Sequence, residues 1–130
     1  MAITIEQLAD DRAVVRIRVG QEVVTIEYFR GRLMEDALAE MQDYCTCSDG
    51  SIASFACLVN KHLVALVANW DIYQDSAWTL KLPIDLSSMN LISLPFRYLM
   101  LKSIVADAFP TEHQAHMQIW QFPEGGVKWQ

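Results

Sequence analysis

Residues 13–29, AVVRIRVGQEVVTIEYF, decide the first part of the fold, because apolar and polar side chains alternate through them on both sides of one glycine. A period of two predicts a pair of strands, and Gly20 followed by Gln21 suits a type II′ turn between them. That turn sets the apolar residues of one face opposite each other, Ile17 with Val24 and Val15 with Ile26. The apolar face of this β-hairpin needs a helix to cover it.

Helical periodicity follows the hairpin. A helix is predicted over residues 34–47, since acidic residues at its start suit the positive end of the helix dipole. The best-defined element comes next: apolar residues recur at helical spacing over 52–70, which predicts an amphipathic helix of about five turns. Either Asp49 or Ser51 can cap it.

The next segment, 71–82, contains a polar break and a weak alternation, and we predict a loop. Asp85 or Ser87 can then cap a short helix through Leu91. Pro95 suits the first turn of a further helix over 95–109.

These elements predict a mainly α (α+β) fold, in which an N-terminal β-hairpin precedes a bundle of about four helices. A single domain is expected over residues 1–110, with the hairpin at 12–30 and the helical part at 33–109. Residues 111–130 have no clear period and contain Pro123, Gly125 and Gly126, so we predict a C-terminal tail, with partial helix as an alternative.

Composition narrows the classes of function. The chain has 130 residues, of which 52% are hydrophobic, enough for one domain with a core. The net charge of −6 argues against nucleic acid as a partner. The three cysteines make an odd count, which suits reduced thiols in a cytosol. The sequence shows neither a signal peptide nor a membrane-spanning stretch. We therefore expect a cytosolic protein that does not bind membranes.

Chemistry has few candidate residues. A zinc site formed by Cys45, Cys47, Cys57 and His62 is disfavoured, because Cys57 and His62 would point about 140° apart on a regular helix. Glu112, His113 and His116 are interpreted as surface residues near a helix end rather than as a metal site. Asp71 and Asp75 are interpreted as turn residues rather than as ligands of a cation. The sequence contains no Gly-rich phosphate loop and no Gly-x-Ser-x-Gly nucleophile elbow. We therefore expect no enzyme, no catalytic residues, no cofactor and no metal.

Binding has stronger support. In the helix over 95–109, the charges Arg97, Lys102 and Asp107 recur every five residues and leave no clean polar face. This helix is therefore either the centre of the core or partly covered by another molecule, and the sequence leaves both readings open. The candidate partner-binding residues around it are Trp70, Trp78, Leu91, Leu94, Phe96 and Met100.

Several short motifs follow one another from Ala65-Leu-Val-Ala-Asn-Trp-Asp-Ile through Asp75 to Pro83-Ile-Asp-Leu-Ser-Ser-Met-Asn-Leu-Ile-Ser-Leu-Pro and an apolar helix. Their order resembles that of the tail assembly chaperones of long-tailed bacteriophages, the siphophages. Val24-Thr-Ile-Glu-Tyr-Phe-Arg-Gly is similar to the N-terminal strand of that family. Ser88 and Met89 depart from the family pattern, which often has an acidic residue there, and residues 111–130 match nothing in it.

The resemblance implies a chaperone that binds the tape measure protein, keeps it soluble and assists tail tube assembly. It implies the tail tube protein and further copies of the chain as additional partners, and a place in the cytoplasm of the infected or lysogenic bacterial host rather than in the mature virion. Two alternatives remain: a small metal-binding enzyme or sensor, and a generic helical or regulatory protein-interaction module.

Overall fold

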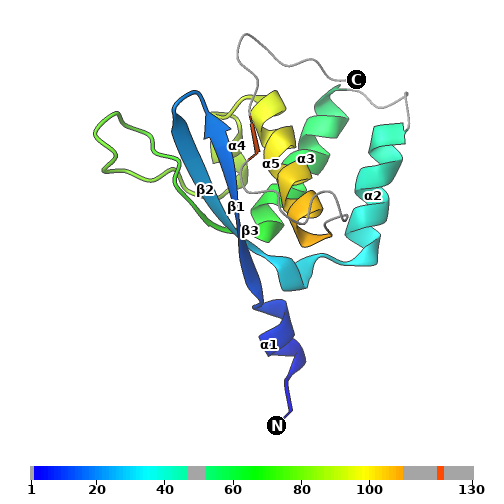
Figure 1. Ribbon diagram of the computed structural model, residues 1–130. Coiled ribbons are helices and arrows are strands. Elements are labelled where there is room, and N and C mark those ends of the chain that lie inside the picture. Colours follow the sequence, from blue (N-terminus) through cyan, green and yellow to red (C-terminus); the bar gives the residue numbers. More distant parts are fainter. Residues whose placement is uncertain (1, 47–51, 110–119, 122–130) are drawn as a thin grey trace.

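The computed structural model describes residues 2–46, 52–109 and 120–121 of the chain (Figure 1). Its elements, in chain order, are α1 (Ile5–Ala9), β1 (Arg12–Val19), β2 (Glu22–Phe29), a 3-10 turn η1 (Arg30–Arg32), α2 (Glu35–Thr46), α3 (Ile52–Leu66), β3 (Val67–Trp70), α4 (Leu86–Met89), α5 (Leu94–Ala108) and β4 (Trp120–Gln121).

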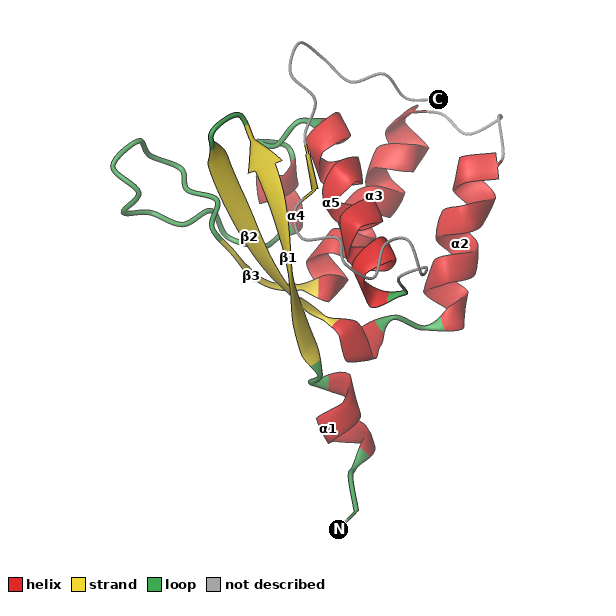
Figure 2. Cartoon of the chain, viewed as in Figure 1, coloured by secondary structure: helices red, strands yellow, loops and turns green. Residues whose placement is uncertain are grey.

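The strands form one sheet in the order β3-β2-β1-β4. β1 pairs antiparallel with β2, β2 pairs antiparallel with β3, and the short β4 pairs in parallel with β1. Helices α2, α3 and α5 all lie on one side of this sheet (Figure 2). The architecture is therefore a sheet with helices packed on one face.

The hairpin prediction is confirmed residue by residue. Ile17 pairs with Val24 and Val15 pairs with Ile26, as the turn requires. Gly20 has a φ of +63°, and Gln21 does not have a positive φ, which is the combination that a type II′ turn needs. The expected helical cover over the apolar face is present, since Val15, Ile17, Ile26 and Tyr28 all belong to the buried core.

The predicted fold class is wrong. A mainly α fold, with a hairpin followed only by helices, is replaced by an α+β fold, because the helix predicted over 52–70 ends at Leu66 and Val67–Trp70 is a strand. This strand pairs with the free edge of β2, with a bulge between Glu27 and Tyr28. A third strand supplies what an isolated hairpin lacks, since two strands alone are marginally stable in water.

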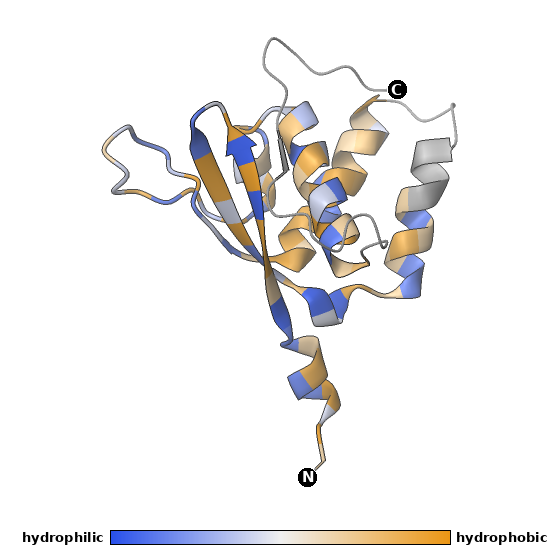
Figure 3. Ribbon diagram, in the orientation of Figure 1, coloured by the Kyte–Doolittle hydropathy of each residue, from blue (hydrophilic) through white to orange (hydrophobic). Residues whose placement is uncertain are grey.

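The core lies between the sheet and the helices on its one face, mainly α3 and α5 (Figure 3). α5 is central: Met100, Ser103 and Ile104 are fully buried, and the Ser103 hydroxyl is satisfied there because it donates to the carbonyl of Leu99 at 2.6 Å. The absence of a clean polar face on this helix is thus explained by burial within the domain. The buried apolar residues of α3 and α5 that form this core are Leu58, Val59, Leu63, Leu66, Leu99, Met100, Leu101 and Ile104.

The remaining boundary predictions have mixed outcomes. The helix predicted over 34–47 is α2, the loop over 71–82 contains a single bridge between Tyr73 and Lys81, and Asp85 caps α4. The proposed caps Asp49 and Ser51 lie outside the described residues, as does the tail over 111–130 apart from β4. In the described part of the chain, no helix has the length and apolar character to cross a membrane.

Candidate partner-binding surface

The structure divides the six residues that the sequence nominated for partner binding. Trp70 and Met100 are 1% and 0% exposed and belong to the core. Trp78 and Leu91 are 69% and 73% exposed, and Leu94 and Phe96 are half-buried.

Trp70 and Met100 cannot form a contact surface in this fold. The indole Nε1 of Trp70 donates to the backbone carbonyl of Leu82 at 2.8 Å, so the ring is both packed and hydrogen-bonded. Met100 lies in the core among the buried residues of the sheet and α3. These two residues stabilise the domain, and Trp78 and Leu91 remain as the exposed candidates.

Trp78 lies in a loop that leaves the sheet after β3. We call residues 71–82 the arm; Figure 1 shows it projecting on the side away from α2, α3 and α5. The two sides of this loop are joined by backbone hydrogen bonds, from Gln74 N to Leu80 O and from Leu82 N to Ile72 O, both 2.8 Å long. The arm is therefore an ordered loop, and the hydrogen bond from Trp70 Nε1 to the carbonyl of Leu82 joins its base to the core.

Asp75 organises the tip of the arm. Its carboxylate accepts hydrogen bonds from the backbone N–H groups of Thr79 and Leu80, each at 3.0 Å, and from the Thr79 hydroxyl. These bonds, that of the Thr79 side chain first, hold the pKa of Asp75 below its usual range. Asp75 is therefore a turn residue, as the sequence predicted.

The backbone at the tip is strained. Trp78 has a φ of +56°, a conformation that a bulky residue rarely adopts, and it is the one non-glycine residue with positive φ in the described ranges. The strained backbone carries an exposed indole, and Leu80, two residues further along, is 60% exposed. Strain of this kind persists where surrounding contacts impose it, and it is concentrated at ligand-binding sites.

A second exposed apolar group lies at α4. Asp85 caps this helix by accepting from Ser88 N at 2.8 Å, and Met89 anchors it with a fully buried side chain. The two leucines flanking this anchor face outward: Leu86 is 60% exposed and Leu91 is 73% exposed. We use the term apolar surface for these exposed side chains together, which form two groups: Trp78 and Leu80 on the arm, and Leu86 and Leu91 at α4.

Arg97 holds the backbone next to Leu91. Arg97 is 8% exposed; its Nε donates to the carbonyl of Ile92 at 2.9 Å, and its Nη1 donates to the side-chain oxygen of Asn60 on α3. Burial lowers its pKa. Through these hydrogen bonds, Arg97 connects the segment between α4 and α5 to α3 and fixes the backbone that carries Leu91.

The sequence missed Leu80 and Leu86 as exposed residues. Leu80 alternates with the polar residues Thr79 and Lys81, as on a strand with one solvated face, and Leu86 follows the cap Asp85 at the first position of a helix. Both sequence patterns could have been noticed, but the exposure of these two leucines depends on the position of the loop after β3, which is a tertiary feature.

The candidate metal ligands are not brought together. Cys57 is an exposed free thiol, whereas His62 is buried with its Nε2 2.8 Å from Glu40 Oε1. Cys47, Glu112, His113 and His116 lie outside the described residues, and the side chain of Cys45 is not described. Within residues 2–46, 52–109 and 120–121, no three His, Cys, Asp or Glu side chains are placed to hold a metal ion.

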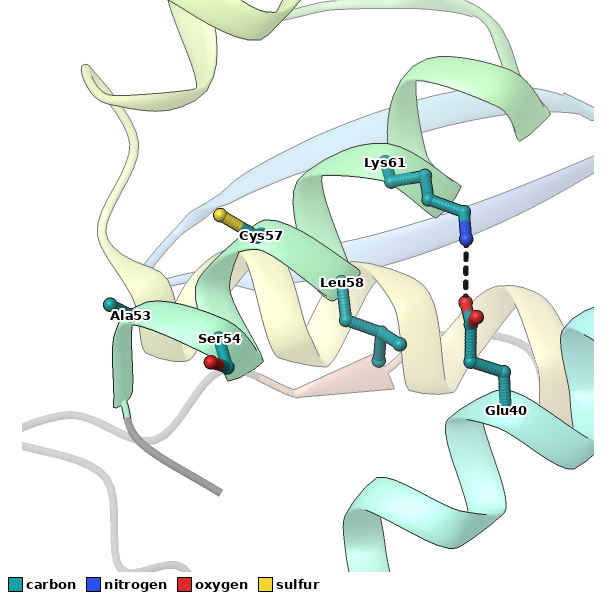
Figure 4. Close-up of a pocket in the computed structure, with 6 residues that line it drawn as sticks. All are labelled: Glu40, Ala53, Ser54, Cys57, Leu58 and Lys61. Carbon is teal, nitrogen blue, oxygen red and sulfur yellow. Dashed lines mark hydrogen bonds and ion pairs between the residues drawn. The ribbon is translucent and has the colours of Figure 1, made fainter.

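A shallow pocket of about 400 Å³ lies between α2 and α3 (Figure 4). Lys61 Nζ donates to Glu40 Oε1 at 2.8 Å across it. The hydrogen bonds from Lys61, and next from His62, keep the pKa of Glu40 below its usual range. This cluster joins α2 to α3, so its role in the fold is structural. The pocket is lined by Glu40, Ala53, Ser54, Cys57, Leu58 and Lys61.

Comparisons with protein-family models, with curated proteins and with solved structures find no match for this chain.

Proposed function

We propose that the chain is a tail assembly chaperone of a long-tailed bacteriophage, a binding protein without catalytic activity. In this role it binds the tape measure protein, keeps that long apolar helical chain soluble, and assists the tail tube protein in assembling around it. It acts in the cytoplasm of the infected or lysogenic host and does not enter the mature virion. The proposal is supported by the ordered motifs from Ala65 to Pro95 and by the apolar surface within that same stretch.

The apolar surface is the observation that carries the proposal. Its four large side chains are 60–73% exposed, although the chain has a sheet and helices against which apolar residues could pack. Burying such a side chain against a client contributes about 1.5–3 kcal/mol. Tryptophan is also enriched among the residues that dominate binding energies.

Rigidity adds to this capacity. Asp75 fixes the tip of the arm, and Arg97 fixes the connection that carries Leu91. A surface that is ordered before binding loses less conformational entropy when a partner docks. The net charge of −6 would keep a complex with an apolar client soluble.

Co-expression tests the proposal. The tape measure protein from the same tail gene cluster is produced with the wild-type chain, with a Trp78→Ser/Leu91→Ser variant, and with a Met34→Ser variant as the matched control. Met34 is 61% exposed but lies between η1 and α2, outside the apolar surface. We expect the wild type and the control to raise the soluble fraction of the client, and the double variant to fail. Equal client solubility with and without the wild-type chain would reject the function.

A further inference from the structure

The first helix, α1, extends away from the sheet and the other helices (Figure 1). In and beside α1, Ile3, Ile5 and Leu8 are 63%, 85% and 52% exposed, and the helix has no buried residue. Its backbone is nevertheless well built, because Thr4 and Gln7 form a reciprocal capping box with bonds of 2.8 and 3.1 Å. An ordered helix this exposed calls for an explanation.

The direction of α1 is fixed by contacts with η1. A Cβ atom at Gly31 would lie 1.7 Å from the carbonyl oxygen of Leu8, so only glycine permits this approach. Arg30 adds a two-pronged ion pair with Asp11, at 2.8 and 3.2 Å, and Gly31 N donates to Asp11 O. α1 is therefore held beyond the Arg12 end of β1 and does not fold back onto its own sheet.

The face of the sheet opposite the helices has a complementary character. Side chains alternate along a strand, so the residues between the buried positions of β1 and β2 point to this face. It presents Val14 and Val23, which are 45% and 38% exposed, together with Arg16 and Arg18. Neither arginine forms an ion pair with a described residue, although the whole chain is acidic. Glu27, which lies opposite Val14 on the same face, is ion-paired with Arg12 at 3.2 Å, so it does not neutralise Arg16 or Arg18. We call Val14, Val23, Arg16 and Arg18 the open face.

We propose that a second copy of this chain covers α1, with α1 of each copy docked on the open face of the other. Ile5 and Leu8 would pack on the valines, and the exposed Glu6 of α1 would face the arginines of the partner copy. Because α1 continues past one end of β1, two copies with antiparallel β1 strands place each α1 beside the other's hairpin. Both contacts then form twice about one two-fold axis, as in most small homo-oligomers.

Sedimentation velocity of the full chain tests this dimer. The wild type is expected to dimerise, and Glu6→Arg, or Arg16→Glu with Arg18→Glu, should each weaken the dimer by about tenfold or more. An equimolar mixture of these two variants should recover a heterodimer, because each contact between α1 and the open face again joins opposite charges. Glu35→Arg, which reverses an exposed first-turn acid on α2, should leave the dimer unchanged.

Circular dichroism separates loss of the dimer from loss of the fold, and Ile5→Ser with Leu8→Ser supplies an apolar variant outside the core. A monomeric wild type at about 100 μM would overturn the proposal, since even a weak specific dimer is populated there. A dimer that is insensitive to Glu6→Arg and to the apolar variant would overturn it equally. The proposal would also be overturned if the charge-reversed mixture failed to associate. It would be overturned as well if α1 variants lost binding to the tape measure protein but still formed the dimer.

Discussion

The strained backbone at Trp78 allows a sharp test of the arm, through the replacement of this residue by glycine and by alanine. Both variants lose the same indole, so the difference between them isolates the backbone conformation, which has a φ of +56°. A left-handed conformation costs a residue with a Cβ about 1–2 kcal/mol. Glycine avoids that cost but loses about 0.5–1 kcal/mol through the greater entropy of its unfolded chain. Trp78→Gly should therefore be more stable than Trp78→Ala by roughly 0.5–1 kcal/mol.

Urea unfolding of both variants measures this difference, and client co-expression measures function. Leu80 is the matched control, since it has a negative φ and similar exposure. There the alanine variant should be at least as stable as the glycine variant. Both Trp78 variants should solubilise less client, even where glycine restores stability. If Trp78→Ala is as stable as Trp78→Gly, the arm does not impose this strain and the reasoning is refuted.

Three further predictions concern the core and its pH dependence. Tyr28→Phe removes the 2.6 Å hydrogen bond to Asp107 and should lower the free energy of unfolding by about 1–2 kcal/mol in urea titrations; no change would show that the bond contributes nothing. Trp70→Phe leaves the carbonyl of Leu82 without its donor and should cost about 1–3 kcal/mol in the same assay, without altering client binding; a lost client would return Trp70 to the binding surface. Glu40 has a lowered pKa, so its contribution to stability is present above the pKa of the unfolded chain and is lost as the pH falls through its folded pKa. Glu40→Gln should therefore flatten the decline of the urea midpoint between about pH 6 and pH 3, and an unchanged slope would contradict this assignment.

The hairpin could be predicted in full because two independent signals agreed. The alternation selected the buried face, and Gly20 selected the turn, so together they left one register. Asp85 and Pro95 likewise indicated the beginnings of α4 and α5 from local chemistry alone, whereas Ser93, the cap of α5, was not predicted.

The third strand could not be predicted, because its residues fit two periods. Leu63, Leu66, Val67 and Trp70 fall on one face of a continuous helix, yet Val67–Trp70 is also a short β-branched and aromatic segment. The choice depended on the free edge of β2, which is a tertiary contact. The helix α1 was missed for another reason, since five residues carry little periodicity and only the Thr4-x-x-Gln7 capping box signals it.

The candidate site could be predicted only in part. Composition alone treats Trp70 and Trp78 alike, and likewise Met100 and Leu91, because large apolar residues serve both cores and interfaces. The fold separates them: the first of each pair is buried, and the second is exposed.

Isothermal titration calorimetry of the purified chain with a soluble tape measure fragment tests the central claim most directly. The wild type and Met34→Ser should bind with equal affinity. Trp78→Ser and Leu91→Ser should each weaken binding by about 2 kcal/mol, or roughly 30-fold, as expected for exposed residues that anchor a client. Undiminished binding by the Trp78→Ser/Leu91→Ser double variant, or no binding by the wild type, would contradict the claim that this apolar surface holds the client.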